Sequence, residues 1–497
     1  DGIRDQPRSR GLGDVYKRQL LNAYIPQVLG TFGVKPKLVK QLRGQTGQLV
    51  GTLGAMASPN TELFDKVVNL CKRRSFVFPS AEIYGGFRST YDYGPLGVLL
   101  LRNVKDAWWR SIVQMRTDVV GLDAAILSPP QVWEASGHLA NFSDPLVDCT
   151  ECKTRHREDQ LDDPNICPSC GAVGKFTEAR AFNLMFKTQM GASSSEDDPS
   201  AVAYLRPETA QSIFTQFKNV LDTSRMKVPF GIAQIGKAFR NEINPRNFTF
   251  RSREFEQMEI EYFCRPGDGL RLTDEWLEKR LSFYEDIGLP REKLHVLDVP
   301  DGERAHYSKK TYDIEFDFPF GCQELEGVAY RTDYDLSKHQ EHSGRPIEYF
   351  DEATKEKFIP HVVEPSAGCD RTVLALLCEA FQEEEVPDAK GKTEVRTVMR
   401  LHPRVAPIKA AIFPLLKKNE EQVRISREIQ RNLGRFMNVF YDETGAVGRR
   451  YRRQDEIGTP FCITVDFETL GEEDPELKDT VTPVSYTHLT LPTKRIV

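Results

Sequence analysis

The sequence predicts an α+β protein of roughly three domains. Three observations support this fold class: two runs of alternating polar and apolar residues around a polar turn between positions 231 and 263, two Cys-x2-Cys pairs between 149 and 170, and alternating strands and helices from 401 to about 484. At 497 residues the chain is too long for one compact core, because single hydrophobic cores stop growing at about 250–300 residues.

The composition is that of an ordinary globular protein, with 39% hydrophobic and 28% charged residues. No apolar run approaches the roughly 20 residues that a membrane span needs, and no apolar segment of the signal-peptide type opens the chain. The net charge of -6 argues against a surface devoted to nucleic acid but allows a local basic patch. The ten cysteines fit a reducing compartment better than a disulfide framework. We therefore expect a cytoplasmic protein without a membrane partner.

Both ends of the chain differ in composition from its middle. Residues 1–55 contain nine Lys or Arg, three Asp and no sustained apolar period. We expect regular structure only after Met56, in a helix capped by Ser58 or Asn60. The last stretch, 485–497, also looks foreign to the domain that it closes. We expect both ends to be non-native or flexible extensions.

A long amphipathic helix is predicted where "GPLGVLLLRNVKDAWWRSIVQM" (94–115) begins with a Gly-Pro turn. After it, "VVGLDAAILSPP" (119–130) predicts a strand that ends at two prolines. Helix and strand form either a dimer surface or a plain core helix with an edge strand, and the periodicity does not decide between the two.

Four cysteines form two knuckles: Cys149 with Cys152 and, after fourteen intervening residues, Cys167 with Cys170. Two such pairs can place four thiolates tetrahedrally around one Zn²⁺. Because cysteine fills all four positions, no position is left for a catalytic water. We therefore expect residues 149–175 to be a zinc-ribbon-like insertion with a structural metal.

Residues 231–263 predict an antiparallel hairpin with a charged face. That face carries Gln234, Arg240, Glu242, Gln257, Glu259 and Glu261. A wall with both signs of charge suits a zwitterion or a metal-bound polyphosphate, because Arg forks match phosphate oxygens and carboxylates hold Mg²⁺ or an ammonium group. Two alternatives remain: a helix with Phe255, Met258 and Tyr262 on one stripe, and an exposed strand whose charges only keep it soluble.

The second half of the chain contains further predicted elements. "TYDIEFDFPFG" (311–321) alternates like a half-buried strand, and 358–381 predicts a strand, a small-residue turn and an apolar helix. An amphipathic helix lies in a helical insertion near 266–300, and the charged stretch 383–400 predicts a linker. The basic cluster "GRRYRRQ" (448–454) is either a nucleic-acid contact, with a tyrosine available to stack on a base, or a solvated loop.

These segments resemble those of a known family. "FRNE" followed by "RSREF" resembles motif 2 of the class II aminoacyl-tRNA synthetases, "GCDR" resembles motif 3, and the strand at Pro129 and Pro130 resembles motif 1, the dimerisation element. Within the class, "EIYGGF", "YDYGPLG", "WEASGH", "RPETAQ", "EFEQMEIEYF" and "VVEPSAG" resemble the homodimeric glycyl-tRNA synthetases, from about Met56 to Thr482. One departure is Asp370, where the class usually has Glu; as a short acid it can still orient Arg371.

The resemblance implies a class II antiparallel sheet flanked by helices, the zinc-ribbon-like insertion, and a C-terminal α/β anticodon-binding domain. The catalytic core is implied in two segments, the first at 56–148 with motif 1 and the second at 176–382 with motifs 2 and 3, separated by the insertion at 149–175. The linker at 383–400 and the anticodon-binding domain at 401–484 follow. Because the resemblance ends at Thr482, this last domain is expected to be incomplete.

The resemblance also assigns site residues. The catalytic residues are Arg240 on the α-phosphate, Arg371 on adenine and the γ-phosphate, and Glu324 on the Mg²⁺ side. The ATP-binding positions are Arg240, Asn241, Glu242, Phe250, Arg251, Arg253, Phe255, Glu324, Leu325, Gly368, Asp370 and Arg371. The glycine-binding positions are Arg157, Glu208, Phe255, Gln257, Glu259, Glu364, Ser366 and Gly368.

The implied activity is that of a glycine–tRNA ligase. Such an enzyme activates glycine with ATP to glycyl-adenylate and pyrophosphate, then transfers glycine to the 3′ end of tRNA(Gly). The implied cofactors are ATP with Mg²⁺ and a structural Zn²⁺, and the implied assembly is a homodimer. The alternatives are a catalytically inactive class II-like nucleic-acid-binding or regulatory subunit and a synthetase for another small amino acid. The presence of the phosphate arginines and the metal-side acids favours the enzyme.

Overall fold

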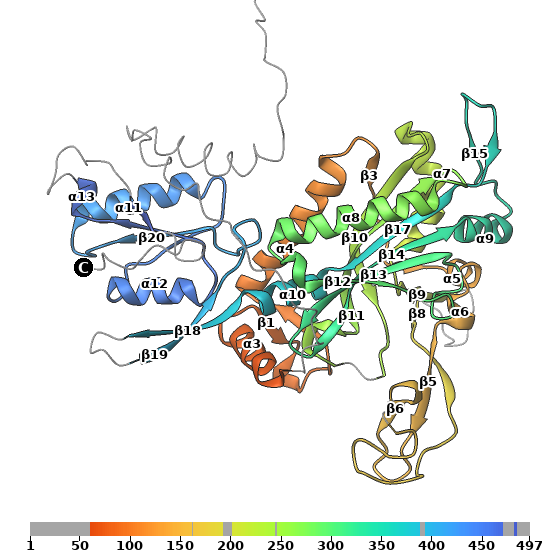
Figure 1. Ribbon diagram of the computed structural model, residues 1–497, viewed down its shortest axis with the longest axis horizontal. Coiled ribbons are helices and arrows are strands. Elements are labelled where there is room, and N and C mark those ends of the chain that lie inside the picture. Colours follow the sequence, from red (N-terminus) through yellow and green to blue (C-terminus); the bar gives the residue numbers. More distant parts are fainter. Residues whose placement is uncertain are drawn as a thin grey trace, which may run out of the picture. The chain divides into compact units, whose positions relative to one another are not determined.

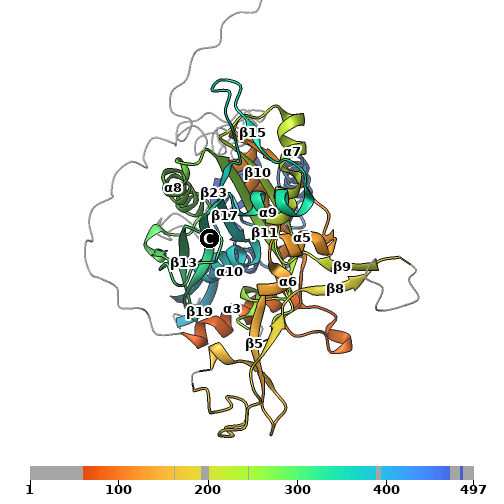
Figure 2. The same ribbon diagram turned by 90° about the vertical axis from the view of Figure 1, so that its right-hand side faces the viewer.

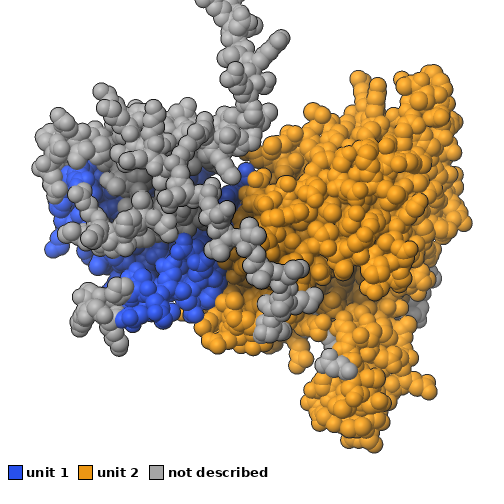
Figure 3. Space-filling view, viewed as in Figure 1, with its two compact units in different colours: residues 1–55, 380–497 blue, residues 56–379 orange. Residues whose placement is uncertain are grey.

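The computed structural model describes residues 60–161, 163–191, 201–243, 246–387, 393–470 and 482–484. The predictions for 1–55, Met56, Ser58 and 485–497 lie outside these residues. The chain divides into two compact units, a larger one of residues 56–379 and a smaller one that contains residues 380–497 (Figure 3). Among the described helices, none is long and apolar enough to cross a membrane.

The larger unit is built on a seven-stranded sheet in the order β12-β13-β14-β17-β11-β10-β3 (Figure 1). Its strands are β3 (Val119–Gly121), β10 (Phe230–Phe239), β11 (Glu254–Cys264), β12 (Leu294–Asp298), β13 (Lys310–Phe318), β14 (Gly321–Thr332) and β17 (His361–Gly368). Neighbours are antiparallel except for β3, which runs parallel to β10. The predicted hairpin is confirmed as β10 and β11, with Gln234 opposite Glu259. The helical alternative for this segment was wrong.

Helices cover both faces of this sheet. On one face, α8 (Gly269–Ile287) packs against the central strands, and Trp276 of α8 meets Tyr262 of β11 with ring centroids 5.3 Å apart. On the other face lies α7 (Ala210–Ser224), whose Phe217 ring centroid is 4.4 Å from that of Phe263. Because side chains alternate along a strand, Glu259 of β11 points to the α7 face. The polar face of the predicted hairpin therefore looks toward α7.

The larger unit contains further elements around this sheet. The helices are α3 (Thr61–Arg73), η3 (Glu82–Tyr84), α4 (Pro95–Trp109), η4 (Arg110–Gln114), α5 (Pro130–Ala135), α6 (His138–Asn141), η5 (Glu158–Gln160), η7 (Phe248–Phe250), η8 (Arg291–Lys293), α9 (Tyr334–Ser343) and α10 (Cys369–Ala380). The strands are β1 (Val77–Pro79), β2 (Tyr91–Tyr93), β4 (Leu127–Ser128), β5 (Ser143–Asp148), β6 (Arg155–Arg157), β7 (Arg180–Asn183), β8 (Phe186–Gln189), β9 (Val202–Leu205), β15 (Tyr349–Phe350) and β16 (Lys357–Phe358). At the start of α3, the Leu63 N–H donates to Asn60 Oδ1 at 3.0 Å, as the predicted cap requires.

The single strand predicted at 119–130 is wrong, because the segment forms β3 and β4 in two different sheets. The backbone between them leaves the ladder and binds side chains instead. The Ala124 N–H donates to Gln234 Oε1 at 2.7 Å, and its carbonyl accepts from Arg206 Nη1 at 3.0 Å. Side chains from distant strands thus satisfy backbone groups that would otherwise need a strand neighbour.

The cysteine segment follows β5 and projects from the body of the larger unit (Figures 1 and 2). Its base is the three-stranded sheet β6-β5-β7. Isolated bridges join Cys149 to Phe176 and Ile166 to Val173. These bridges bring the two cysteine pairs to the same place.

The smaller unit alternates strands and helices, as predicted. Its sheet has the order β21 (Val439–Tyr441), β20 (Ala410–Pro414), β22 (Phe461–Val465), β23 (Thr482–Val484). On one face, α11 (Glu420–Leu433) packs through Ile429 and Leu433 on Ala410 and Ile412, and on the other α12 (Val447–Asp455) packs through Tyr451 on Phe413. The short helix α13 (Phe467–Leu470) follows β22.

The stretch 383–400, predicted as a linker, is instead most of a hairpin. Strands β18 (Phe381–Pro387) and β19 (Thr393–Met399) pair antiparallel, with Glu384 opposite Arg396. Glu384 also forms an ion pair with Arg400. The charged residues that indicated a linker lie opposite one another on the two strands instead.

The basic cluster 448–454 lies on α12, where it mostly binds its own unit. Arg450 is 2% exposed and donates to the carbonyls of Pro414, Glu443 and Gly445. The Tyr451 hydroxyl lies 2.6 Å from Thr464 Oγ1, and its ring packs edge-on against Phe413, so its own unit holds this side chain. The alternative of a solvated loop was wrong because the cluster is helical, and a contact of Tyr451 with a base stays a prediction.

Candidate active site

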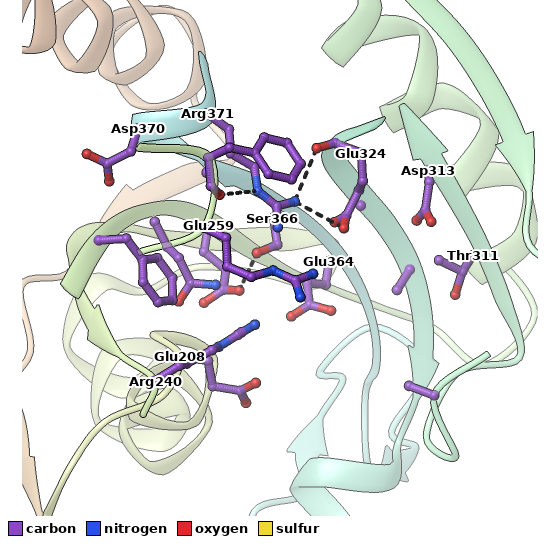
Figure 4. A pocket seen from close by; sticks show the side chains of 18 of the residues that line it. Glu208, Arg240, Glu259, Thr311, Asp313, Glu324, Glu364, Ser366, Asp370 and Arg371 are labelled. Carbon is purple, nitrogen blue, oxygen red and sulfur yellow. Dashed lines mark hydrogen bonds and ion pairs between the residues drawn. The ribbon is translucent and has the colours of Figure 1, made fainter. Parts of the chain in front are cut away.

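A cavity of about 440 Å³ opens on the α7 face of the large sheet (Figure 4). Most of the predicted site residues line it: Glu208, Arg240, Glu242, Phe250, Arg251, Phe255, Gln257, Glu259, Glu324, Glu364, Ser366, Gly368, Asp370 and Arg371. They come from segments that are far apart in the sequence, and β11, β14 and β17 bring them together. The sheet is therefore what assembles this site.

Four predicted site residues lie outside the lining of this cavity. Arg157 of β6 forms ion pairs with Asp144 at 2.8 Å and Asp159 at 2.7 Å. The Asn241 N–H donates to a backbone carbonyl, Leu325 is fully buried, and Arg253 donates to the carbonyls of Arg88 and Glu242. These residues are held by contacts within the fold in this structure.

Three arginines line the cavity, with Arg371 at the end where Glu324 lies and Arg240 beside Glu208 (Figure 4). Arg371 Nη1 lies 3.1 Å from Glu324 Oε2 and donates to the Glu324 carbonyl at 3.1 Å. The Arg371 charge holds the pKa of Glu324 below its ordinary value. Arg240 lies between the rings of Phe142 and Phe255, and Arg251 Nη1 is buried without a hydrogen-bond partner among the described residues. Such an unpaired guanidinium nitrogen fits a phosphate oxygen.

Asp313 of β13 faces the same end, and the sequence reasoning did not assign it to the site. Burial, together with the charges of Glu324 and Glu315, raises the pKa of Asp313 to about 7. Figure 4 shows its carboxylate beside that of Glu324. Two carboxylates facing a phosphate-sized space fit Mg²⁺, which prefers oxygen ligands. The alternation of Asp and apolar residues in 311–318 was the signal that could have identified Asp313.

A β-bulge in β14 aims Glu324 at the cavity. Ile314 pairs with Glu326 and Glu315 pairs with Glu324, which leaves Leu325 as the extra residue. Gly327 and Ala329 line the cavity, whereas Glu326 faces α8 and binds Arg280 at 2.6 Å. Simple alternation from Gly327 would point Leu325 into the cavity and Glu324 away from it. Because Leu325 is an extra residue, the side chain of Glu324 points into the cavity instead.

Carboxylates gather at the other end of the cavity. Glu259 accepts a hydrogen bond from Ser366 Oγ at 2.6 Å and another from Thr209 Oγ1. Glu208 lies 3.3 Å from His138 Nε2, and although burial raises its pKa, the charges of His138 and Arg331 hold it below its ordinary value. Burial raises the pKa of Glu364 to about 8, against the effect of Arg331. An anionic, walled pocket of this kind fits an ammonium group.

A buried ion-pair network supports this end, and the sequence reasoning missed it. Arg331 is 1% exposed and binds Asp335 at 2.8 and 2.9 Å and Glu364 at 2.8 Å. Its guanidinium carbon is 3.8 Å from the ring centroid of Tyr307. The Arg-x3-Asp spacing is compatible with one helical turn, but nothing local in it indicates a binding site. The network forms because β14 and β17 lie side by side in the sheet.

Asp370 does not orient Arg371, so that expectation was wrong. Its carboxylate accepts from the Tyr93 hydroxyl at 2.6 Å and from the Glu256 N–H at 2.6 Å. Figure 4 shows it pointing away from the guanidinium of Arg371. The reason is geometric: α10 begins directly after β17, and successive residues at this junction point to different sides. Arg371 is held instead by Glu324 and by the Phe250 carbonyl at 3.3 Å.

The four predicted metal ligands converge. The sulfur atoms of Cys149, Cys152, Cys167 and Cys170 lie within 4.8 Å of one another, and two of the pairs are 3.7 Å apart. Tetrahedral Zn²⁺ with four Zn–S bonds of about 2.3 Å places sulfur atoms about 3.8 Å apart. The donor set therefore fits zinc.

Comparison with known proteins identifies the family. Residues 186–380 match the tRNA synthetase class II core domain (G, H, P, S and T), and residues 409–487 match an anticodon binding domain. The chain is 52% identical over 443 residues to the glycine–tRNA ligase of Clostridium perfringens, covering 84% of this chain and 93% of that protein. The chain belongs to the glycine–tRNA ligase family.

Two further members of the family are similarly close. The glycine–tRNA ligase of Treponema denticola is 52% identical over 419 residues, and that of Thermobifida fusca is 52% identical over 430 residues. In both cases the match covers 83% of this chain and 92% of the relative. The matched length includes the sheet that carries the cavity, so the chain has the fold of an enzyme of this family. The predicted class II fold and the predicted family are confirmed.

Proposed function

We propose that this protein ligates glycine to tRNA(Gly), with the cavity on the large sheet as its active site. The observation that carries the proposal is that one cavity contains three arginines together with a group of buried carboxyl groups. Arg240, Arg251 and Arg371 fit the phosphates of ATP, and Glu208, Glu259 and Glu364 fit the amino group of glycine. The arrangement brings an ammonium-binding group and a phosphate-binding group into one cavity, as adenylate formation requires.

The first step needs alignment more than proton transfer. The glycine carboxylate is already ionised at neutral pH, so it attacks the α-phosphorus without a general base and pyrophosphate leaves. Arg240 and Arg371 would neutralise the negative charge that develops on the phosphate oxygens. Mg²⁺, when it arrives with ATP, adds positive charge, and Asp313 and Glu324 are the acids that would hold it. In the second step, a ribose hydroxyl at the end of tRNA attacks the adenylate.

Selection of glycine is a steric problem, because every competing amino acid has a side chain. A filled pocket excludes them all, and editing is unnecessary. ATP–pyrophosphate exchange with glycine, alanine, serine and proline tests the proposal. We expect exchange with glycine alone. Exchange with another amino acid, or none with any of them, would contradict it.

Two features of the assembly also belong to the proposal. The cysteine cluster supports a structural Zn²⁺, and intact mass with zinc analysis tests it. The motif 1-like segment, in which Leu127 is 44% exposed, supports a homodimer through this face, and sedimentation equilibrium tests it. The ten cysteines, all among the described residues and all free thiols, support a reducing compartment such as the cytoplasm.

A further inference from the structure

Glu261 of β11 is a buried carboxyl group that lacks a partner among the described residues. It lies two residues beyond Glu259 on the same face of the strand, behind the wall of the cavity. Its side chain is 0% exposed, and neither carboxylate oxygen has a hydrogen-bond partner in the part of the chain that the structure describes. A carboxylate in such a place is strongly disfavoured if it stays charged and unpaired.

Glu261 is close to two other carboxyl groups. Oxygens of Glu259, Glu261 and Glu364 lie within 4.8 Å of one another, and all three residues are buried. Donors approach two of them: Ser366 and Thr209 donate to Glu259, and Arg331 donates to Glu364. No described residue donates to Glu261. Ionised carboxylates only accept hydrogen bonds, so the three cannot satisfy one another unless one of them carries a proton.

Burial raises the pKa of all three carboxyl groups, and the neighbouring cations and donors distinguish Glu261 from the other two. Arg331 of β14 is already bound by Asp335 of α9 and by Glu364 of β17, so its charge is divided between two acids. Glu208, at the start of α7, is kept ionised by His138 and adds negative charge to the same region. Among the described residues, Glu261 therefore faces an excess of negative charge and forms no ion pair with a cation.

We propose that Glu261 is a positioning residue for glycine: it keeps its proton at neutral pH and donates a hydrogen bond to the Glu259 and Glu364 pair that receives the amino group. The inference rests on the proposed function and deepens it. Burial and the charge of Glu364 raise the pKa of Glu261 well above its ordinary value. A protonated carboxyl group is a donor, and it holds its neighbours in place without adding a negative charge behind the pocket.

Two substitutions test whether Glu261 acts as a neutral hydrogen-bond donor. Glu261→Gln keeps the shape and a donor but is always neutral, whereas Glu261→Met keeps the approximate volume and removes the donor. In ATP–pyrophosphate exchange, we expect Glu261→Gln to keep the KM for glycine within about twofold and Glu261→Met to raise it about tenfold, since a lost hydrogen bond to a charged group has this size. The KM for ATP stays unchanged in both. A loss in Glu261→Gln as large as in Glu261→Met would overturn the proposal.

A second measurement does not depend on catalysis. The infrared spectrum of the substrate-free protein at pH 7, minus that of Glu261→Gln, should contain the C=O band of a protonated carboxyl group. The exposed Glu62→Gln is the control and should show none. Absence of the band in the wild type, or its appearance only after Na⁺ or K⁺ is removed, would overturn the inference in favour of a bound cation. If the band is present and glycine supports no exchange, the proposed function fails while the protonation of Glu261 stands.

Discussion

Arg371 contacts Glu324 at two atoms at once, with Nη1 3.1 Å from the side-chain oxygen Oε2 and 3.1 Å from the main-chain carbonyl oxygen. The same guanidinium lies 4.5 Å from the ring centroid of Phe250. Motif 3 and the bulged strand β14 therefore meet through one side chain. This contact links the residue expected to bind phosphate with the residue expected on the metal side.

Arg371→Met should lose most of the activation step. The substitution keeps an apolar stem over Phe250 and removes the charge that neutralises ATP. We expect ATP–pyrophosphate exchange to fall about 10²-fold to 10³-fold, the range for loss of one preorganised charge-stabilising group. Circular dichroism should be unchanged. The exposed Arg345→Met is the matched control, and an Arg371→Met variant with activity near that of the control would contradict the assignment.

Arg240→Ala should abolish exchange while the protein stays folded. Arg240 donates from Nε to the Pro207 carbonyl at 3.1 Å and lies over two aromatic rings. Removing it therefore costs the fold little and removes the group expected on the α-phosphate. Arg240→Lys should keep some activity, because the charge remains although the fork is lost. Normal exchange in Arg240→Ala would remove Arg240 from the mechanism.

The binding of Mg²⁺ with ATP should weaken as the pH falls through about 7. The pKa of Asp313 is about 7, so this carboxyl group is protonated below that pH and cannot bind a cation. The KM for the Mg²⁺ complex of ATP should rise below pH 7, and Asp313→Asn should lose this dependence. A wild-type profile that is flat between about pH 6 and pH 8 would exclude Asp313 from the metal side.

Ionisation of Asp313 should favour Mg²⁺ binding but lower the stability of the folded protein. Its folded-state pKa lies above the ordinary 3.8, so the neutral form stabilises the fold, and this stabilisation is lost as pH rises through about 7. Asp313→Asn is neutral throughout and should raise the melting temperature at pH 8 by about 2 °C or more. The difference should shrink at pH 6. A destabilised variant at pH 8 would show that the charge of Asp313 is paired rather than costly.

Removal of one cysteine should release the metal and loosen the insertion alone. We expect zinc in the wild type at one atom per chain and none in Cys149→Ser, because three thiolates hold the ion much more weakly. Limited proteolysis should then cut within 149–175, while the sheet of the larger unit keeps its melting temperature. Cys264→Ser, at a buried cysteine outside the cluster, is the control and should keep the zinc. A wild type without zinc would contradict the assignment.

Substitution of two neighbouring arginines of α12, Arg449 and Arg450, should have very different effects on stability. Arg450 is buried and donates to three carbonyls, so Arg450→Met leaves these groups unsatisfied and should destabilise the smaller unit by about 2 kcal/mol or more. Arg449 is exposed, and Arg449→Met should change stability little. All four tryptophans lie in the larger unit, so far-ultraviolet circular dichroism should report the loss and tryptophan fluorescence should not. Equal effects of both substitutions would contradict the assigned contacts.

Several features followed directly from local sequence patterns. The period of two predicted β10, β11 and β13, because a half-buried strand must alternate its side chains. The spacing of the cysteines predicted their convergence, because each knuckle is a local turn. Most predicted cavity residues were assigned by the resemblance to the family rather than by a local pattern, and they line the cavity.

The errors came from contacts between segments far apart in the chain. Charge alone predicted a linker at 383–400, but the partner of Glu384 is a residue across a hairpin. The prediction for Asp370 assumed a contact with its sequence neighbour, whereas its partners are Tyr93 and the backbone of β11. Local patterns do not contain these partners, because which distant residues meet depends on how the strands are ordered.

The sequence by itself predicted the fold class and most of the strands and helices around the site, and its resemblance to the family pointed to the arginines that line the cavity. Only the tertiary structure decided which acids face the cavity. The extra residue at Leu325 turns Glu324 toward it and Glu326 away, against simple alternation. Likewise, Glu261 differs from Glu259 only in its neighbours, since both are glutamates on one face of one strand. A carboxyl group's charge depends on burial and on nearby donors, and those are properties of the folded molecule.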